Sequence, residues 1–251
     1  MSSVKEYLFE VEQDRFLAWA GDRLNAEDVE ESSEAYQALA QEYSDMMDAY
    51  DEEAQYRWLE RQSFHDQYIE FDTELRRAVA LLSDSEHGSH LQMMCKLLYA
   101  HVVTLLEAMI STSVQALIVR DKKFLLNISR QIETFNRGKK FTLAEIAEHP
   151  KGVEGVVLKS LSEMTFHNPT TIKTVLCALI GDHMKDLDIS PMIPISRLRH
   201  DIVHRNGRTV DDEPIVLESR EVFLAMHDID AFASDISRRI RQALDDMDEK
   251  L

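Results

Sequence analysis

Glycine and proline are scarce in this sequence, with seven glycines and five prolines among 251 residues. These two residues interrupt helices more strongly than any others, and long stretches of the chain contain neither. A chain of this length can bury a sizeable core, either as one large domain or as two smaller ones. The sequence therefore predicts an all-α fold built from long helices.

The acidic character of the chain is concentrated in its N-terminal third. The formal net charge is −18, and residues 1–90 alone hold 23 acidic and 7 basic residues. Residues 91–251 are close to neutral, with 23 acidic and 21 basic residues. Because phosphate binding needs local positive charge, the acidity argues against nucleic-acid binding by the N-terminal third and leaves the remainder open.

Two groups of helices are expected, separated by a turn. Residues 4–20 have the pattern of an amphipathic helix with four candidates for its buried side, Leu8, Val11, Phe16 and Trp19. The following stretch to Leu82 predicts one long helix or two antiparallel helices with an acidic solvent face. The alternatives are that this face docks a partner or mimics nucleic acid. The turn signal at Asp84–Ser89 divides the chain into an acidic helical region, 1–85, and a second helical domain, 86–251.

The second domain opens with a strongly apolar helix from about Leu91 to Val119, in which Glu107 is an embedded charge. Its expected core stripe consists of Leu97, Leu98, Val102, Leu105, Leu106, Met109 and Ile110. The apolar stretch from Leu97 to Ile110 is too short to span a bilayer, so no membrane partner is expected. A basic segment follows and is a candidate for contact with phosphate; it contains Arg120, Lys122, Lys123, Arg130, Arg137, Lys139 and Lys140.

Local signals mark the remaining helices. Thr142 and Glu145 form a capping box, and Asn168-Pro169 is an N-cap followed by proline, which starts a helix that reaches about Asp186. A further helix begins near Ile195 and ends at Asn206-Gly207, because both residues tolerate a left-handed backbone. Residues Thr209 to Leu217 are expected to form a turn or a brief hairpin before a last helix from Ser219 to Met247.

The residues with the clearest chemical potential lie in the segment Ser196–Arg208, which holds four arginines, two histidines and one aspartate. Arg199 and His204 are five residues apart, so we expect their long side chains to converge across one helical turn, with Leu198, Ile202 and Val203 facing the core. Arginine can bind a phosphate bidentately, and histidine can transfer a proton near neutral pH. The pair therefore suits phosphodiester cleavage without a metal, while Asp201 would orient an arginine.

The arrangement of an arginine, four residues and a histidine, followed by Arg-Asn-Gly, resembles the active-site motif of the HEPN superfamily. The stretch Tyr99–Ala108 is also similar to the early helix of that family, and Glu107 matches its acidic position. The resemblance covers roughly residues 90–245 and implies an antiparallel helical bundle preceded, in this chain, by the acidic helices. It further implies a metal-independent and cofactor-free endoribonuclease that forms a homodimer with a composite cleft, as in RNA-cleaving toxins and antiviral defence effectors.

By this resemblance, Arg199 binds the scissile phosphate of an RNA substrate and His204 is the general acid or base. His200, Asn206 and Glu107 would support these two residues. Many members of the superfamily carry asparagine or aspartate where this chain has His200, and many have lost catalysis. The alternative function is therefore a non-catalytic dimerisation module that recruits a protein partner through residues 1–85.

Two other interpretations of the motif remain. His200-Asp201-Ile-Val-His204 is similar to the H-E-x-x-H zinc motif, but aspartate is one methylene shorter than glutamate and no third ligand is obvious. A purely structural interpretation places the arginines at a helix C-terminus, where positive charge is favoured. That explains Arg205 and Arg208 better than Arg199, which lies earlier in the helix.

The two cysteines and the N-terminal residues indicate the cellular compartment in which the protein is expected. Cys95 and Cys177 sit in apolar surroundings with no partner motif, which is typical of a reducing compartment and gives neither thiol an activating neighbour. The N-terminal residues become acidic at once and lack an apolar segment, so no secretory signal is expected. These features predict a cytoplasmic protein.

Overall fold

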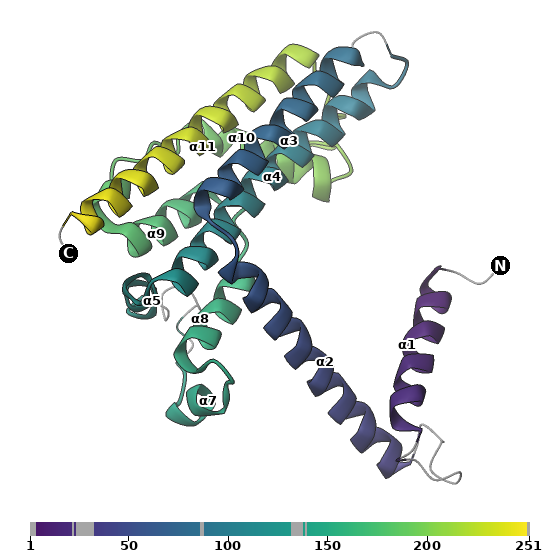
Figure 1. Ribbon diagram of the computed structural model, residues 1–251. Coiled ribbons are helices and arrows are strands. Elements are labelled where there is room, and N and C mark those ends of the chain that lie inside the picture. The colour runs from purple at the N-terminus through teal and green to yellow at the C-terminus, as the bar shows by residue number, and fades with distance from the viewer. Residues whose placement is uncertain are drawn as a thin grey trace. The chain divides into compact units, whose positions relative to one another are not determined.

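The computed structural model describes residues 4–21, 23, 33–85, 88–131, 138 and 140–249 (Figure 1). Within these ranges the protein is helical, with no strand or sheet, so the all-α prediction is confirmed. The expected turn before the last helix is also present as an isolated bridge between Arg208 and Pro214. Two members of the basic segment, Arg137 and Lys139, lie outside the described residues.

The chain divides into two compact units, residues 1–58 and residues 59–251. The division therefore does not fall at residues 85 and 86, where the turn signal placed it. The physical reason is that the helix before that turn packs along the helix after it, as an antiparallel pair, so the turn lies inside the second unit. A turn signal marks a change of chain direction, which is not the same as a loss of contacts.

The first unit contains α1 (Val4–Ala20) and most of α2 (Glu34–Glu60). Its small core is aromatic: Phe16 is buried and packs edge-on against Tyr36 and Tyr43, with ring centroids 5.0 and 5.6 Å away. Of the residues expected on the buried side of α1, Leu8 is instead 54% exposed. Aromatic contacts of this kind hold α1 and α2 together where little aliphatic surface is available.

The second unit is a helical bundle. Its elements are α3 (Phe64–Asp84), α4 (Leu91–Arg120), α5 (Lys122–Ser129), α7 (Leu143–Glu148), α8 (Gly152–Ser162), α9 (Pro169–Ile180), the 3₁₀ helix η1 (Gly181–Met184), α10 (Met192–His204) and α11 (Ser219–Asp248). Helix α4 is central, since α3, α5, α8, α10 and α11 all pack against it. Figure 1 shows α3, α4 and α11 running alongside one another.

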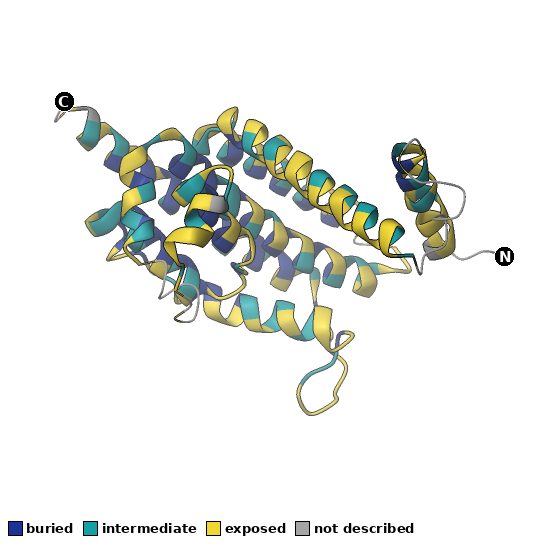
Figure 2. Ribbon diagram, turned by 90° about the horizontal axis from the view of Figure 1, so that it is seen from below, coloured by how far each residue is buried: buried dark blue, intermediate teal, exposed yellow. Residues whose placement is uncertain are grey.

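Helix α4 carries much of the core of this unit. Most of the predicted apolar stripe is buried, including Leu98, Val102, Leu106 and Ile110. Leu97 was also expected in the stripe, but this prediction is wrong because its side chain is 59% exposed. Figure 2 shows buried residues concentrated where the helices of the bundle face one another.

The apolar stretch Leu97–Ile110 is shorter than a membrane span, but by length and composition the whole of helix α4 could cross a membrane. The 30-residue helix contains an 18-residue window of mean hydropathy 1.8, but 61% of that window is buried inside the protein. Most of its apolar side chains are covered by other helices of the same unit, as in the core helix of a soluble protein.

Local capping chemistry fixes several helix ends as the sequence predicted. Thr142 and Glu145 form the reciprocal capping box of α7, and the Asn168 side chain accepts a hydrogen bond from the Thr170 amide at the start of α9. Helix α9 ends at Ile180, before the expected Asp186, because Gly181 has a φ of 77° and breaks the α-helical path. The residues after it continue as η1.

An arginine on α11 ties η1 to the bundle. The Arg239 side chain donates hydrogen bonds to the carboxylate of Asp235 at 2.7 Å and to the carbonyl of His183 at 2.7 Å. Only 17% of the Arg239 side chain is exposed, so these bonds are partly shielded from water. Arg239 therefore stabilises the fold, because its guanidinium donates charge-assisted hydrogen bonds to a carboxylate and to a backbone carbonyl.

We expect the Arg239→Met substitution to lower the free energy of unfolding by about 1.5–3 kcal/mol, because charge-assisted hydrogen bonds to η1 and Asp235 are lost. Urea denaturation followed by circular dichroism measures the change. Arg241→Met, at an exposed position of the same helix, is the control and should change it by less than about 0.5 kcal/mol. Equal effects of the two substitutions would contradict the role of Arg239.

Asp235 makes part of this stability pH-dependent. Burial alone would raise its pKa, but hydrogen bonds from Arg239 and Arg238 outweigh burial and hold the pKa of Asp235 below its ordinary value. A lowered pKa in the folded state contributes stability above the unfolded pKa of about 3.9 and loses it as the pH falls further. We therefore expect the wild type to exceed Asp235→Asn in unfolding free energy at pH 7, with a difference that shrinks toward pH 3. A difference that is independent of pH would contradict this.

Candidate functional site

The motif helix α10 ends where the sequence predicted. The helix stops at His204, and Asn206 and Gly207 follow with φ angles of 54° and 72°. The left-handed backbone at these two residues turns the chain sharply away from the helix axis. The side chain of Asn206 is exposed, and its left-handed backbone forms part of this turn.

Hydrogen bonds hold the turn against the rest of the bundle. The Gly207 amide donates to the Ile202 carbonyl at 3.1 Å, and the Gly207 carbonyl accepts from the Ile215 amide at 2.9 Å. On α4, the Gln92 side chain both donates to the Leu217 carbonyl and accepts from the Leu217 amide. The end of α10 and the segment leading to α11 are therefore fixed relative to α4.

Arg199 and Glu107 meet in the interior between α10 and α4. An Nη2 atom of Arg199 lies 3.8 Å from Oε2 of Glu107, and only 12% of each side chain is exposed. The Nε atom of Arg199 is buried and has no hydrogen-bond partner in the described structure. Glu107, the charge embedded in the apolar helix, is thus paired with a motif arginine, but the hydrogen bonding of that arginine is incomplete.

A third residue, His167, joins this pair from the loop before α9. Its Nδ1 atom lies 2.6 Å from Oε1 of Glu107. Because a carboxylate only accepts hydrogen bonds, the imidazole N–H donates. Sequence reasoning did not place His167 in this site: it is 60 residues from Glu107, and no local pattern connects the two.

His200 and His204 form a separate pair on the outer side of α10. Their ring centroids are 4.8 Å apart, and both residues are exposed. Five residues of helix correspond to a rotation of about 140°, so Arg199 and His204 start from different sides of α10. The structure accordingly places Arg199 at Glu107 and His204 beside His200, as two pairs on one helix.

The other charged residues of the motif have local partners. Asp201 pairs with Arg205 at 2.9 Å, which agrees with a role in orienting an arginine, and Arg208 contacts Asp212 within the following turn. Leu198 and Ile202 pack against the core as expected. Val203 does not, because its side chain is 46% exposed, so its predicted burial is wrong.

Neither metal nor thiol chemistry gains support from the geometry. Across the ranges that the structure describes, no three histidine, cysteine, aspartate or glutamate side chains gather closely enough to hold a metal ion, so the zinc interpretation lacks a third ligand there. Burial raises the pKa of the Cys95 thiol and that of the Cys177 thiol. Both thiols are therefore poorer nucleophiles than an ordinary cysteine at neutral pH.

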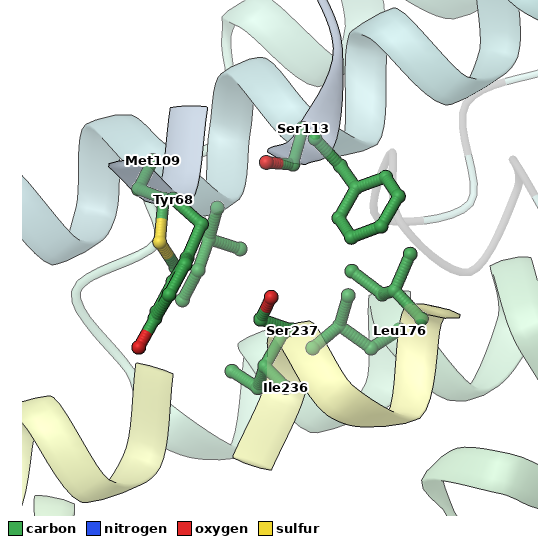
Figure 3. Close-up of a pocket in the computed structure, with 9 residues that line it drawn as sticks. Tyr68, Met109, Ser113, Leu176, Ile236 and Ser237 are labelled. Carbon is green, nitrogen blue, oxygen red and sulfur yellow. The ribbon is translucent and has the colours of Figure 1, made fainter. Parts of the chain in front are cut away.

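An apolar cavity lies elsewhere in the bundle, between α3, α4, α9 and α11 (Figure 3). Apolar side chains such as Met109, Leu176 and Ile236 line it. Ser237 is also part of the lining, and its buried hydroxyl has no hydrogen-bond partner in the described structure. A ligand site needs several convergent polar groups, so the cavity is best explained as imperfect packing.

The basic segment is displayed on the surface. Its described members are all exposed: Arg120, Lys122, Lys123, Arg130 and Lys140. Exposed basic side chains can contact phosphates without sequence preference. This segment is therefore available to bind nucleic acid but supplies no group suited to proton transfer.

Comparison of the chain with models of protein families, with curated proteins and with solved structures gives no significant match.

The incomplete pairing of Arg199 leads to a stability prediction. Removing the arginine of a well-made buried ion pair lowers the free energy of unfolding by about 3–5 kcal/mol, because its partner is left as an unpaired buried charge. Removing a buried donor that has no acceptor instead relieves a penalty of about 1–3 kcal/mol. Glu107 also keeps His167 as a partner. We expect Arg199→Met to lower the unfolding free energy by less than about 1 kcal/mol, clearly less than Arg239→Met. A loss as large as that of Arg239→Met would identify Arg199 as a structural residue.

Proposed function

We propose that the protein is a metal-independent endoribonuclease whose centre is Arg199, with Glu107 behind it and the His200–His204 pair on the same helix. The observation that carries the proposal is the state of Arg199, a guanidinium with a buried unpartnered Nε and an ion pair of 3.8 Å. A buried polar group without a hydrogen-bond partner needs an explanation, and a catalytic role is one of those known for such groups. A phosphate oxygen is the acceptor that best fits a guanidinium.

The proposed chemistry uses the RNA itself as nucleophile. The ribose 2′-hydroxyl loses a proton and attacks the adjacent phosphorus, and the bond to the 5′ oxygen breaks as that oxygen gains a proton. Arg199 stabilises the charge that develops on the phosphoryl oxygens, and His204 transfers one of the two protons. The products are a cyclic phosphate and a 5′-hydroxyl, and no metal is required.

A homodimer is part of the proposal. Arg199 and His204 leave opposite sides of α10 within one chain, so a second copy is a means of supplying both groups to one phosphate. Helices α4 and α10 pack together, and both carry large apolar side chains exposed to solvent: Met93, Leu97, Ile193 and Val203. Exposed apolar residues on neighbouring helices support a self-association face.

The acidic first unit would then restrain activity or recruit a partner, in a cytoplasmic protein of the toxin or antiviral defence type. A second function is favoured by one observation on that unit. Helix α1 exposes three consecutive large residues, Tyr7, Leu8 and Phe9, with exposed fractions of 62, 54 and 61%. Such a run suits a protein partner, so the alternative is a non-catalytic interaction module in which the second unit dimerises and the first recruits.

Cleavage of mixed structured and single-stranded RNAs in excess EDTA tests the ribonuclease proposal. We expect fragments with 5′-hydroxyl ends from the wild type, and a loss of about 10²–10⁴-fold in rate for His204→Ala, because a proton-transfer group has been removed. His227→Ala is the control, since His227 is an exposed helical histidine outside the motif, with 79% of its side chain exposed, and it should cleave at the wild-type rate.

Other results of the cleavage experiment would favour other functions or another site. Cleavage that EDTA abolishes would contradict the metal-free mechanism and revive the zinc interpretation. Absence of cleavage by folded, dimeric wild type would contradict the nuclease and favour the interaction module. Equal rates for wild type and His204→Ala would place the activity outside the motif.

A further inference from the structure

The closest contact of Glu107 is with His167, and not with Arg199. The histidine nitrogen lies 2.6 Å from one carboxylate oxygen, within the range of a strong charge-assisted hydrogen bond, whereas Arg199 lies 3.8 Å from the other oxygen. A carboxylate that served only to neutralise Arg199 would approach the guanidinium more closely. The geometry indicates that Glu107 chiefly positions His167.

Glu107 and His167 differ in their exposure to solvent. The Glu107 side chain is 12% exposed and is held on the central helix α4, so it is a rigid, shielded acceptor. The His167 side chain is 46% exposed, so a ligand can reach its ring. A hydrogen bond from Nδ1–H to a fixed carboxylate selects the tautomer whose other nitrogen, Nε2, carries the lone pair.

We propose that His167 is a second proton-transfer residue of the site, positioned by Glu107 and acting beside Arg199 on an RNA phosphate. This inference rests on the proposed ribonuclease function and adds a residue to it. Three separate elements, α4, α10 and the loop before α9, converge on the Glu107 carboxylate. They bring together an arginine for phosphate and an oriented histidine for protons, as a phosphoryl-transfer site requires.

The reaction needs one base and one acid, and the two histidine sites supply them. Nε2 of His167 accepts the proton of the 2′-hydroxyl as the 2′ oxygen forms its bond to phosphorus. The bond between phosphorus and the 5′ oxygen breaks, and protonated His204, supplied by the second copy in the proposed homodimer, donates its proton to that oxygen. The negative charge of the phosphodiester is retained in the cyclic product, and the two histidines exchange protonation states.

His167→Asn isolates the proposed role. The asparagine amide N–H₂ can replace Nδ1–H as the donor to Glu107, but no nitrogen remains to accept a proton. We expect single-turnover RNA cleavage in EDTA to fall by about 10²–10⁴-fold. The acidic limb of the pH–rate profile, which reports loss of a proton from the base, should disappear. His227→Ala should retain both the rate and the profile of the wild type.

A second measurement is independent of activity. Long-range ¹H–¹⁵N spectra of the full chain, with histidines labelled, report the tautomer of each ring. We expect the Nδ1–H form for His167 in the wild type and its loss in Glu107→Met. A 2′-O-methyl oligonucleotide, which binds without being cleaved, should shift the His167 ring signals and leave those of His227 in place.

The outcomes separate the two proposals. A wild-type rate and profile in His167→Asn, alongside an inactive His204→Ala, would overturn the role of His167 while keeping the ribonuclease. An Nε2–H tautomer at His167 in the wild type would overturn the inference whether or not RNA is cleaved. If the wild type cleaves no RNA, the ribonuclease proposal fails, and His167 signals that the oligonucleotide does not shift overturn this inference as well.

Discussion

A single shielded carboxylate, that of Glu107, organises the candidate site. It stands on the central helix α4, where burial of an unpaired charge would be strongly unfavourable, so the surrounding chain must supply partners. Arg199 on α10 and His167 before α9 supply them, and this joins three elements at one point. The tight turn at Asn206-Gly207 and the Gln92 bridge to Leu217 then hold the end of α10 against α4. Arg199 is not fully hydrogen-bonded, because its Nε has no partner in the described structure. Arg239 differs from it, since its guanidinium donates hydrogen bonds to groups of the protein itself.

Much of the fold could be predicted from the sequence because its signals are local. The capping box at Thr142, the N-cap at Asn168 and the left-handed stop at Gly207 depend on residues within four positions of one another, and all three are present. The division between the units was misplaced because a turn signal carries no information on which helices pack together. Leu97 and Val203 were expected to be buried because hydrophobicity alone does not distinguish a core face from an exposed one.

The candidate site was predictable only in part, because contacts between distant parts of the chain leave no local signal in the sequence. An embedded glutamate on an apolar helix implies a cationic partner, and a motif arginine is the partner that the structure places there. The spacing of Arg199 and His204 suggested one shared edge, but helical rotation directs Arg199 inward and leaves His204 exposed beside His200. His167 lies 60 residues from Glu107 and could be found only once the chain was folded. Its inclusion adds a histidine beside Arg199 at the Glu107 carboxylate, whereas His204 lies beside His200 on a different side of α10.

We propose that the RNA supplies its own nucleophile at a metal-free arginine–histidine site. The most direct measurement compares, in excess EDTA, an RNA that the wild type cleaves with the same strand carrying a single 2′-deoxy substitution at the nucleotide 5′ to the cleaved bond. The account predicts that the substituted strand is intact at that bond and still cleaved elsewhere, because the attacking 2′ oxygen has been removed. Cleavage of both strands at that bond would show that water is the nucleophile and would contradict the account, as would the absence of any cleavage.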